Sequence, residues 1–141
     1  MRDGSDDVEL TPHPGLGSLG PLLNEVRGAG LAVELHVEGE AFALPPAVDL
    51  SAYRIVQEGL TNALKHAHAE RADVVVRYAT DELRIDVRDD GRGAAPSDGL
   101  GHGLVGIRER VKLFGGEMTA GAQNGEGFLL STRLPLADVE R

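Results

Sequence analysis

The longest regular pattern of apolar positions lies between Arg54 and Ala67, where they recur at steps of three and four. This spacing places the apolar side chains on one stripe and predicts an amphipathic helix. The stripe consists of Tyr53, Val56, Leu60, Ala63, Leu64 and Ala67. Another side of the same helix carries polar residues within roughly 100° of its circumference. These residues are Glu58, Asn62, Lys65 and His66.

The polar side of this helix has a chemistry that suits a metal and a phosphate. Glu58 and Asn62 lie one turn apart and offer the oxygen ligands that Mg²⁺ prefers. Lys65 follows almost one turn later and could meet phosphate charge. A half-buried helix with a polar rim explains the same residues equally simply. The helix alone therefore does not decide between a binding site and an ordinary surface.

Two further helices are predicted on either side of the long one. The first has its apolar face at Leu19, Leu22, Leu23 and Val26. Ser18 is a candidate N-cap of this helix, and Gly28 and Gly30 end it. Asp49 is a candidate N-cap of the long helix. A third helix is predicted over 104–114, ended by two glycines.

Alternating apolar positions predict about five strands. The strands cover 31–37, 72–78, 83–87, 117–122 and 128–134, and a turn at Asp81-Glu82 joins the second to the third. Three helices and about five strands, mostly linked as hairpins, predict an α+β two-layer sandwich. Residues 1–17 are polar and rich in Gly and Pro, so we expect a flexible tail, a single domain over 18–136 and a short tail at 137–141.

Composition narrows the class of ligand. The chain has 141 residues and a formal net charge of −9, which argues against a nucleic-acid-binding surface. An anionic ligand would have to be held by a metal ion, by backbone N–H groups or by a few well-placed cations. Cysteine is absent, which excludes disulfides and thiolate zinc sites. Neither a membrane span nor a hydrophobic signal region is evident, so a cytoplasmic location is expected.

A long glycine-rich loop over 89–103 is the second candidate for chemistry. Asp89 follows a strand directly and could accept a hydrogen bond from an amine such as that of adenine. Gly91 and Gly93 would let a flat ring approach the backbone closely. At the far end, Gly101 and Gly103 could point N–H groups at a phosphate beside a helix start. A plain turn remains the alternative for each glycine group taken alone.

The order of these three motifs resembles the N, G1 and G2 boxes of the GHKL ATPase superfamily. The boxes are Glu58-x-x-x-Asn62-x-x-Lys65-His66, Asp89-x-Gly91-x-Gly93 and Gly101-x-Gly103-Leu104-x-Gly106. Residues 57–67 look like the catalytic ATP-binding domain of bacterial sensor histidine kinases. Residues 103–110 resemble the subfamily that pairs with LuxR-type response regulators.

The resemblance implies the Bergerat fold, a mixed sheet covered by helices on one face, and the ligands ATP and Mg²⁺. It implies that Asn62 binds Mg²⁺ and that Glu58 supports the hydrated metal or a water. Lys65 and His66 would lie near the phosphates or ribose. Asp89 would receive the adenine amine, beside Gly91 and Gly93. The residues implied at the phosphates from the second glycine group are Gly101, His102, Gly103 and Leu104.

Several residues depart from the family pattern or have no expected role. Gly127-Phe128 stands where the family commonly has Gly-Thr, so one adenine-side hydroxyl is missing. Asp90 and Arg92 are predicted to be surface residues of the loop. The residues predicted to be surface histidines without a role are His13, His36 and His68.

The family's phosphoacceptor segment is not found in this sequence. His13 lies between prolines, which exclude a helix there. We therefore expect a fragment of a longer histidine kinase, which transfers the ATP γ-phosphoryl to a histidine on a dimerisation domain, upstream of a response regulator. The fragment is expected to be a monomer, and the parent kinase could be membrane-anchored. The alternative is a self-contained anti-sigma-factor serine kinase of the same superfamily, whose size this chain fits.

Overall fold

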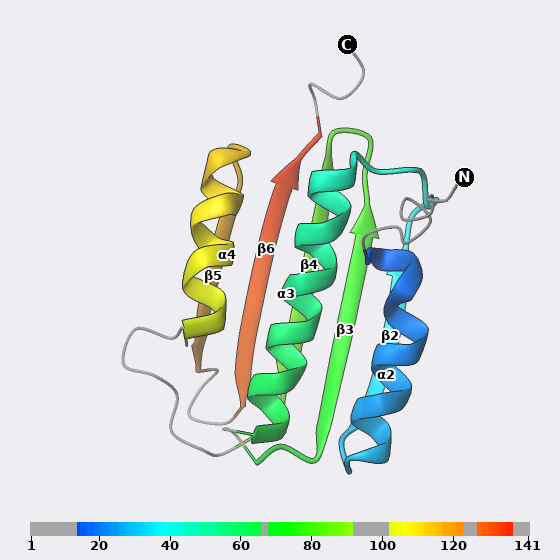
Figure 1. The fold of residues 1–141 in the computed structure, drawn as a ribbon, viewed down its shortest axis with the longest axis vertical. Coiled ribbons are helices and arrows are strands. Elements are labelled where there is room, and N and C mark those ends of the chain that lie inside the picture. Colours follow the sequence, from blue (N-terminus) through cyan, green and yellow to red (C-terminus); the bar gives the residue numbers. More distant parts are fainter. Residues whose placement is uncertain (1–13, 66–67, 92–101, 123–126, 137–141) are drawn as a thin grey trace, which may run out of the picture.

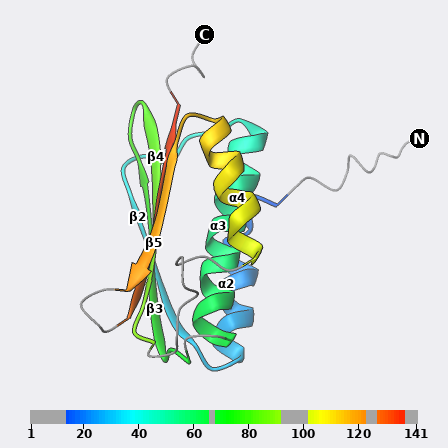
Figure 2. The same cartoon turned by 90° about the vertical axis from the view of Figure 1, so that its left-hand side faces the viewer.

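The computed structural model describes residues 14–65, 68–91, 102–122 and 127–136, with only the backbone at His102 and Ala122. Within these ranges the chain forms two layers, a five-stranded sheet and a layer of helices on one of its faces (Figures 1 and 2). The predicted α+β two-layer fold is therefore confirmed.

Every helix and strand that the sequence pattern predicts is present among the described residues. The helical elements are a 3₁₀ turn η1 (Leu16–Ser18) and the helices α2 (Leu19–Gly28), α3 (Pro46–Lys65) and α4 (His102–Leu113). The strands are β2 (Ala32–Glu38), β3 (Arg71–Tyr78), β4 (Glu82–Asp89), β5 (Glu117–Ala122) and β6 (Phe128–Pro135).

The sheet has the strand order β2-β3-β4-β6-β5 and is mixed. β2 pairs with β3 in parallel, and the other neighbouring pairs are antiparallel. Parallel neighbours need a crossover connection, and α3 supplies it between β2 and β3. This topology lays α3 across the middle of the sheet (Figure 1).

An aliphatic core fills the space between the sheet and the helices. Ile55, Val56 and Leu60 of α3 are fully buried against it. The predicted stripe was only partly right, since Tyr53 and Leu64 are half-buried while the unpredicted Ile55 is fully buried. The strands contribute alternate residues to the same core, among them Val74, Val76, Leu83, Ile85, Leu130 and Leu134.

Of the two predicted helix caps, Ser18 does occupy the N-cap position of α2, whereas the prediction of Asp49 as the N-cap of α3 was wrong. Ser18 makes no side-chain capping hydrogen bond, because it closes the 3₁₀ turn that runs straight into α2. Asp49 lies inside the first turn of α3, because that helix begins at Pro46, a residue whose fixed φ suits a first helical position. The Asp49 carboxylate accepts a hydrogen bond from the Leu16 N–H at 2.9 Å and so joins η1 to α3.

Candidate functional site

The predicted site segments meet at one end of the sheet, the lower end in Figure 1. The last turns of α3, the end of β4 and the first turn of α4 all lie there. The start of β6 joins them, because Asp89 and Phe128 are partners in the β4–β6 register. Residues far apart in the sequence therefore share one small region above the sheet.

Glu58 on α3 touches the first turn of α4. A Cβ atom added to Gly103 would lie 2.2 Å from Oε1 of Glu58, closer than any real contact allows. Only a glycine at this position leaves room for the carboxylate in its present place. Asn62, one turn further along α3, is half-buried like Glu58, whereas Lys65 at the end of the helix is exposed.

Gly59 sets how closely α3 approaches the sheet. A Cβ atom on Gly59 would lie 3.0 Å from Cγ1 of Val87 on β4, tighter than most such contacts. Val87 lies two residues before Asp89 on the same face of β4. The glycine therefore brings the polar side of α3 near the end of that strand.

Asp89 is a buried carboxyl group at the end of β4. It continues the alternation that points Leu83, Ile85 and Val87 into the core, and only 5% of its surface is exposed. Its Oδ1 accepts a hydrogen bond from the Gly91 N–H at 2.7 Å. Burial raises the pKa of Asp89, and the Gly91 hydrogen bond opposes that shift without cancelling it. Within the described ranges its donor is the Gly91 N–H, so this carboxyl group could accept a further hydrogen bond from a ligand.

Gly127 closes the region from the β6 side. Its N–H donates to the Gly91 carbonyl at 3.1 Å, and its φ is +78°. A Cβ atom here would lie 2.4 Å from the Asp89 carbonyl oxygen, so both the backbone conformation and the close approach require glycine. Phe128 follows on the helix side of β6 and is half-buried against the core.

Asp90 has a structural role that the sequence did not reveal. It is exposed, as expected, but its Oδ1 accepts hydrogen bonds from the N–H groups of Glu70 at 2.9 Å and Arg71 at 3.0 Å. Its own N–H donates to the Arg71 carbonyl at 3.2 Å. The backbone donors lower the pKa of Asp90. This pair of bonds fastens the segment that follows α3 to the residue next to Asp89.

Several predicted site residues lie outside the described residues. They are His66, Gly93 and Gly101, together with Arg92, and the side chain of His102 is likewise not described. Leu104 is fully buried, so its side chain belongs to the core and only its backbone could face a ligand. His68 is exposed with a φ of 54°, in the left-handed region that is uncommon outside glycine.

Sequence reasoning missed the contacts that join these segments. The contact of Glu58 with Gly103 spans 45 residues, and that of Gly59 with Val87 spans 28. One signal was available, since a glycine in the middle of a strong helical pattern often marks a close packing position.

The arrangement suits a polar ligand with an amine at one end and negative charge at the other. The buried carboxyl group of Asp89 offers an acceptor for the amine. Glu58 and Asn62 offer oxygen ligands for a hydrated cation next to the N-terminus of α4, where free N–H groups favour an anion.

The comparisons with known proteins agree with this geometry. Residues 47–138 match the family model of the histidine kinase-, DNA gyrase B-, and HSP90-like ATPases. The chain belongs to this family.

Similar proteins of known class narrow the class of protein within this family. The sensor histidine kinase YxjM of Bacillus subtilis is 36% identical over 90% of this chain and 32% of its own length. The sensor histidine kinase LnrJ of the same organism is 29% identical over 97% of this chain and 36% of its own length. The oxygen sensor histidine kinase NreB of Staphylococcus carnosus is 30% identical over 77% of this chain and 32% of its length. This chain thus spans about a third of such relatives, which favour the histidine kinase interpretation over the anti-sigma-factor kinase.

Solved structures give the same fold. The histidine kinase domain of the blue-light activated histidine kinase EL346 from Erythrobacter litoralis superposes with a TM-score of 0.66 at 26% identity, covering 86% of this chain and 61% of that one. The histidine kinase ShkA, solved in complex with AMPPNP, gives a TM-score of 0.63 at 21% identity over 82% of this chain and 27% of that one.

Among the described residues, no helix is long and apolar enough to cross a membrane.

Proposed function

We propose that this chain is the ATP-binding catalytic domain of a two-component sensor histidine kinase. The reaction is transfer of the ATP γ-phosphoryl group to a histidine on a dimerisation domain, and a response regulator acts downstream. The observation that carries the proposal is the convergence of Glu58, Gly103 and the buried Asp89 at one end of the sheet, in a chain of this ATPase family.

The residues fit Mg-ATP on grounds of shape and donor chemistry. Gly103 lets the Glu58 carboxylate lie against the first turn of α4, because a Cβ atom there would clash with it. Asn62 would hold Mg²⁺ and Glu58 would hold one of its waters, while Gly103, His102 and Gly101 would offer backbone N–H groups to the phosphates. Asp89 would accept the adenine amine, with Gly91 and Gly93 shaping that end of the site. Lys65 and His66 remain candidates for the phosphates or ribose.

Catalysis in this arrangement is positioning and charge neutralisation. Bound Mg²⁺ supplies a positive charge that offsets the charge on the transferring phosphoryl group. The chain's own part is to orient the phosphates through fixed backbone donors, which need no rearrangement during the reaction. Glu58 and Asn62 stand on a helix packed into the core, so their backbone positions are set before the nucleotide arrives.

The first test separates nucleotide binding from transfer. This chain alone should bind Mg-ATP but should carry no label after incubation with γ-labelled ATP, because the proposed acceptor histidine lies elsewhere. Adding a separately expressed dimerisation domain from the same gene should give acid-labile, alkali-stable label on that domain. Label on a histidine of this chain, or on a serine of an added protein instead, would overturn the proposal.

A further inference from the structure

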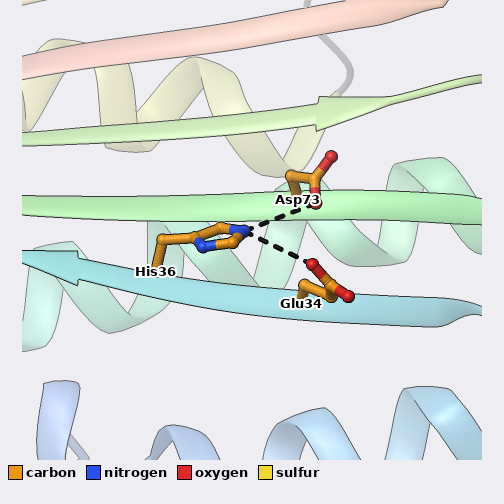
Figure 3. A group of neighbouring side chains, drawn as sticks. All are labelled: Glu34, His36 and Asp73. Carbon is orange, nitrogen blue, oxygen red and sulfur yellow. Dashed lines mark ion pairs between the residues drawn. The ribbon is translucent and has the colours of Figure 1, made fainter.

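A compact group of three polar side chains lies on the face of the sheet that the helices leave open (Figures 2 and 3). Nε2 of His36 lies 3.6 Å from Oε1 of Glu34 and 3.7 Å from Oδ1 of Asp73. One ligand atom from each residue falls within 4.8 Å of the others. His36 is therefore a surface histidine, as predicted, but it has neighbours that the sequence did not show.

Strand geometry holds this group together. Glu34 and His36 are two residues apart on β2 and so project from the same face. Glu34 and Asp73 are register partners across the parallel β2–β3 pair. The three side chains thus stand on two strands whose backbone positions are fixed by the sheet, and only their side-chain torsions remain free.

We propose that Glu34, His36 and Asp73 form a binding site for a divalent transition-metal cation, with Zn²⁺ as the representative ion. One imidazole nitrogen and two carboxylate oxygens are a donor set that Zn²⁺ accepts. Tetrahedral ligands about 2.0–2.1 Å from zinc lie about 3.3 Å from one another. The His36 distances of 3.6 and 3.7 Å are close to that separation, so small torsional changes complete the site. Water would take the fourth position.

The charge of the group favours a cation. Two carboxylates and a neutral imidazole carry two negative charges. The register partner of Asp73 on β4 is Arg88, whose single positive charge is smaller than the combined charge of the two carboxylates. A divalent cation therefore still meets net negative charge. Mg²⁺ is a poor competitor because it prefers oxygen ligands and dehydrates reluctantly.

This site is separate from the proposed nucleotide site. The three side chains project from the open face, whereas α3 and α4 cover the other face (Figure 2). A cation here would cross-link the edge strand β2 to β3. We therefore expect it to raise the thermal stability of the chain without changing its affinity for Mg-ATP.

The test is a calorimetric titration of the nucleotide-free chain with ZnCl₂. His36→Gln and Asp73→Asn should each weaken zinc binding by about ten-fold or more, since even second-shell changes cost that much in known sites. His68→Gln is the matched control, because His68 is exposed and lies before the start of β3, outside the three proposed ligands, and it should leave the affinity unchanged. Zinc should also raise the melting temperature of the native chain and of His68→Gln, but not that of His36→Gln.

Equal zinc affinity in the native chain, His36→Gln and Asp73→Asn would overturn the proposal, as would no zinc binding at all. Either result would mean that the three residues form only a group of neighbouring polar side chains on the surface. Far-UV circular dichroism checks that each variant is folded. A titration of each variant with Mg-ATP tests the proposed nucleotide site separately, so failure of the zinc site and failure of the proposed function can be told apart.

Discussion

At the scale of single residues, Asp89 and Asp90 are neighbours with opposite environments. Asp89 is buried and its pKa is raised by that burial, whereas Asp90 is exposed and its pKa is lowered by backbone N–H donors. Asp90 fastens the backbone after α3 to the end of β4, and Asp89 is left with acceptor capacity facing the site. Asp90 therefore contributes to stability, whereas we propose that Asp89 contributes to binding.

Asp89→Asn should stabilise the nucleotide-free chain. A carboxyl group whose folded pKa is raised costs no stability below its unfolded pKa, and the cost grows as the pH rises through the folded value. Asn removes this cost and its oxygen can still accept from the Gly91 N–H. Urea unfolding between pH 3 and pH 8 should show a fall in stability with pH for the native chain that is smaller in Asp89→Asn. A variant that is less stable than the native chain at neutral pH would contradict this explanation.

Asp90→Ala should destabilise the chain by about 1–2 kcal/mol, because two backbone N–H groups lose their acceptor but can still reach water. Since the folded pKa of Asp90 is lowered, its contribution is fully present above the unfolded pKa and is lost as the pH falls through the folded value. The unfolding free energies of native and variant chains should therefore converge in acid. Asp81→Ala, an exposed aspartate in the β3–β4 turn, is the control. A constant difference across the pH range would show that another effect dominates.

At the scale of elements, glycines decide how the helices meet each other and the sheet. Gly59 brings α3 onto Val87, and Gly103 leaves space for Glu58 between α3 and α4. The second contact joins two of the three motifs of the family. Changes in either glycine should therefore alter the site more than the fold.

Gly103→Ala should keep the fold and displace the Glu58 carboxylate, because the far end of a flexible side chain moves more easily than a helix. Mg-ATP affinity should fall by roughly ten-fold, the scale of one hydrogen bond to a charged group. Gly20→Ala in α2 is the matched control, since nothing lies within 4 Å of its added Cβ, and it should leave affinity unchanged. Equal affinities in the two variants, measured by calorimetry, would show that Glu58 does not take part in binding.

The elements themselves could be predicted from the sequence, because their signals are local. Apolar spacing along α3 and alternation in β3 and β4 were enough to place them, with ends shifted by one to several residues. The Asp49 cap failed because its partner was not local: Asp49 bonds to Leu16, 33 residues away. The three motifs of the site could likewise be recognised from the sequence. Two other features could not, because they depend on packing and on strand register: the contact of Glu58 with Gly103 and the grouping of His36 with Asp73.

At the scale of the whole molecule, one face of the sheet is apolar and covered by helices, and the other is polar and open. The helix side holds the core and the proposed nucleotide site. The open side is polar, with ion pairs such as Arg77 Nε to Glu38 Oε1 at 2.7 Å and a hydrogen bond from Ser131 Oγ to Asp86 Oδ1 at 2.7 Å. Exposed pairs of this sort contribute little stability each. Substitutions on the open side should therefore leave nucleotide binding intact.

The most direct measurement is a calorimetric titration of this chain with ATP, in the presence and absence of Mg²⁺, for the native chain, Asp89→Asn and the control Asp81→Asn. The native chain and Asp81→Asn should bind one ATP, more tightly with Mg²⁺ and in preference to GTP. Asp89→Asn should weaken binding by about ten-fold or more, because a charge-assisted hydrogen bond is worth roughly 1.5–3 kcal/mol. No ATP binding by the native chain, or equal affinity in both variants with the fold intact, would contradict the assignment of this site.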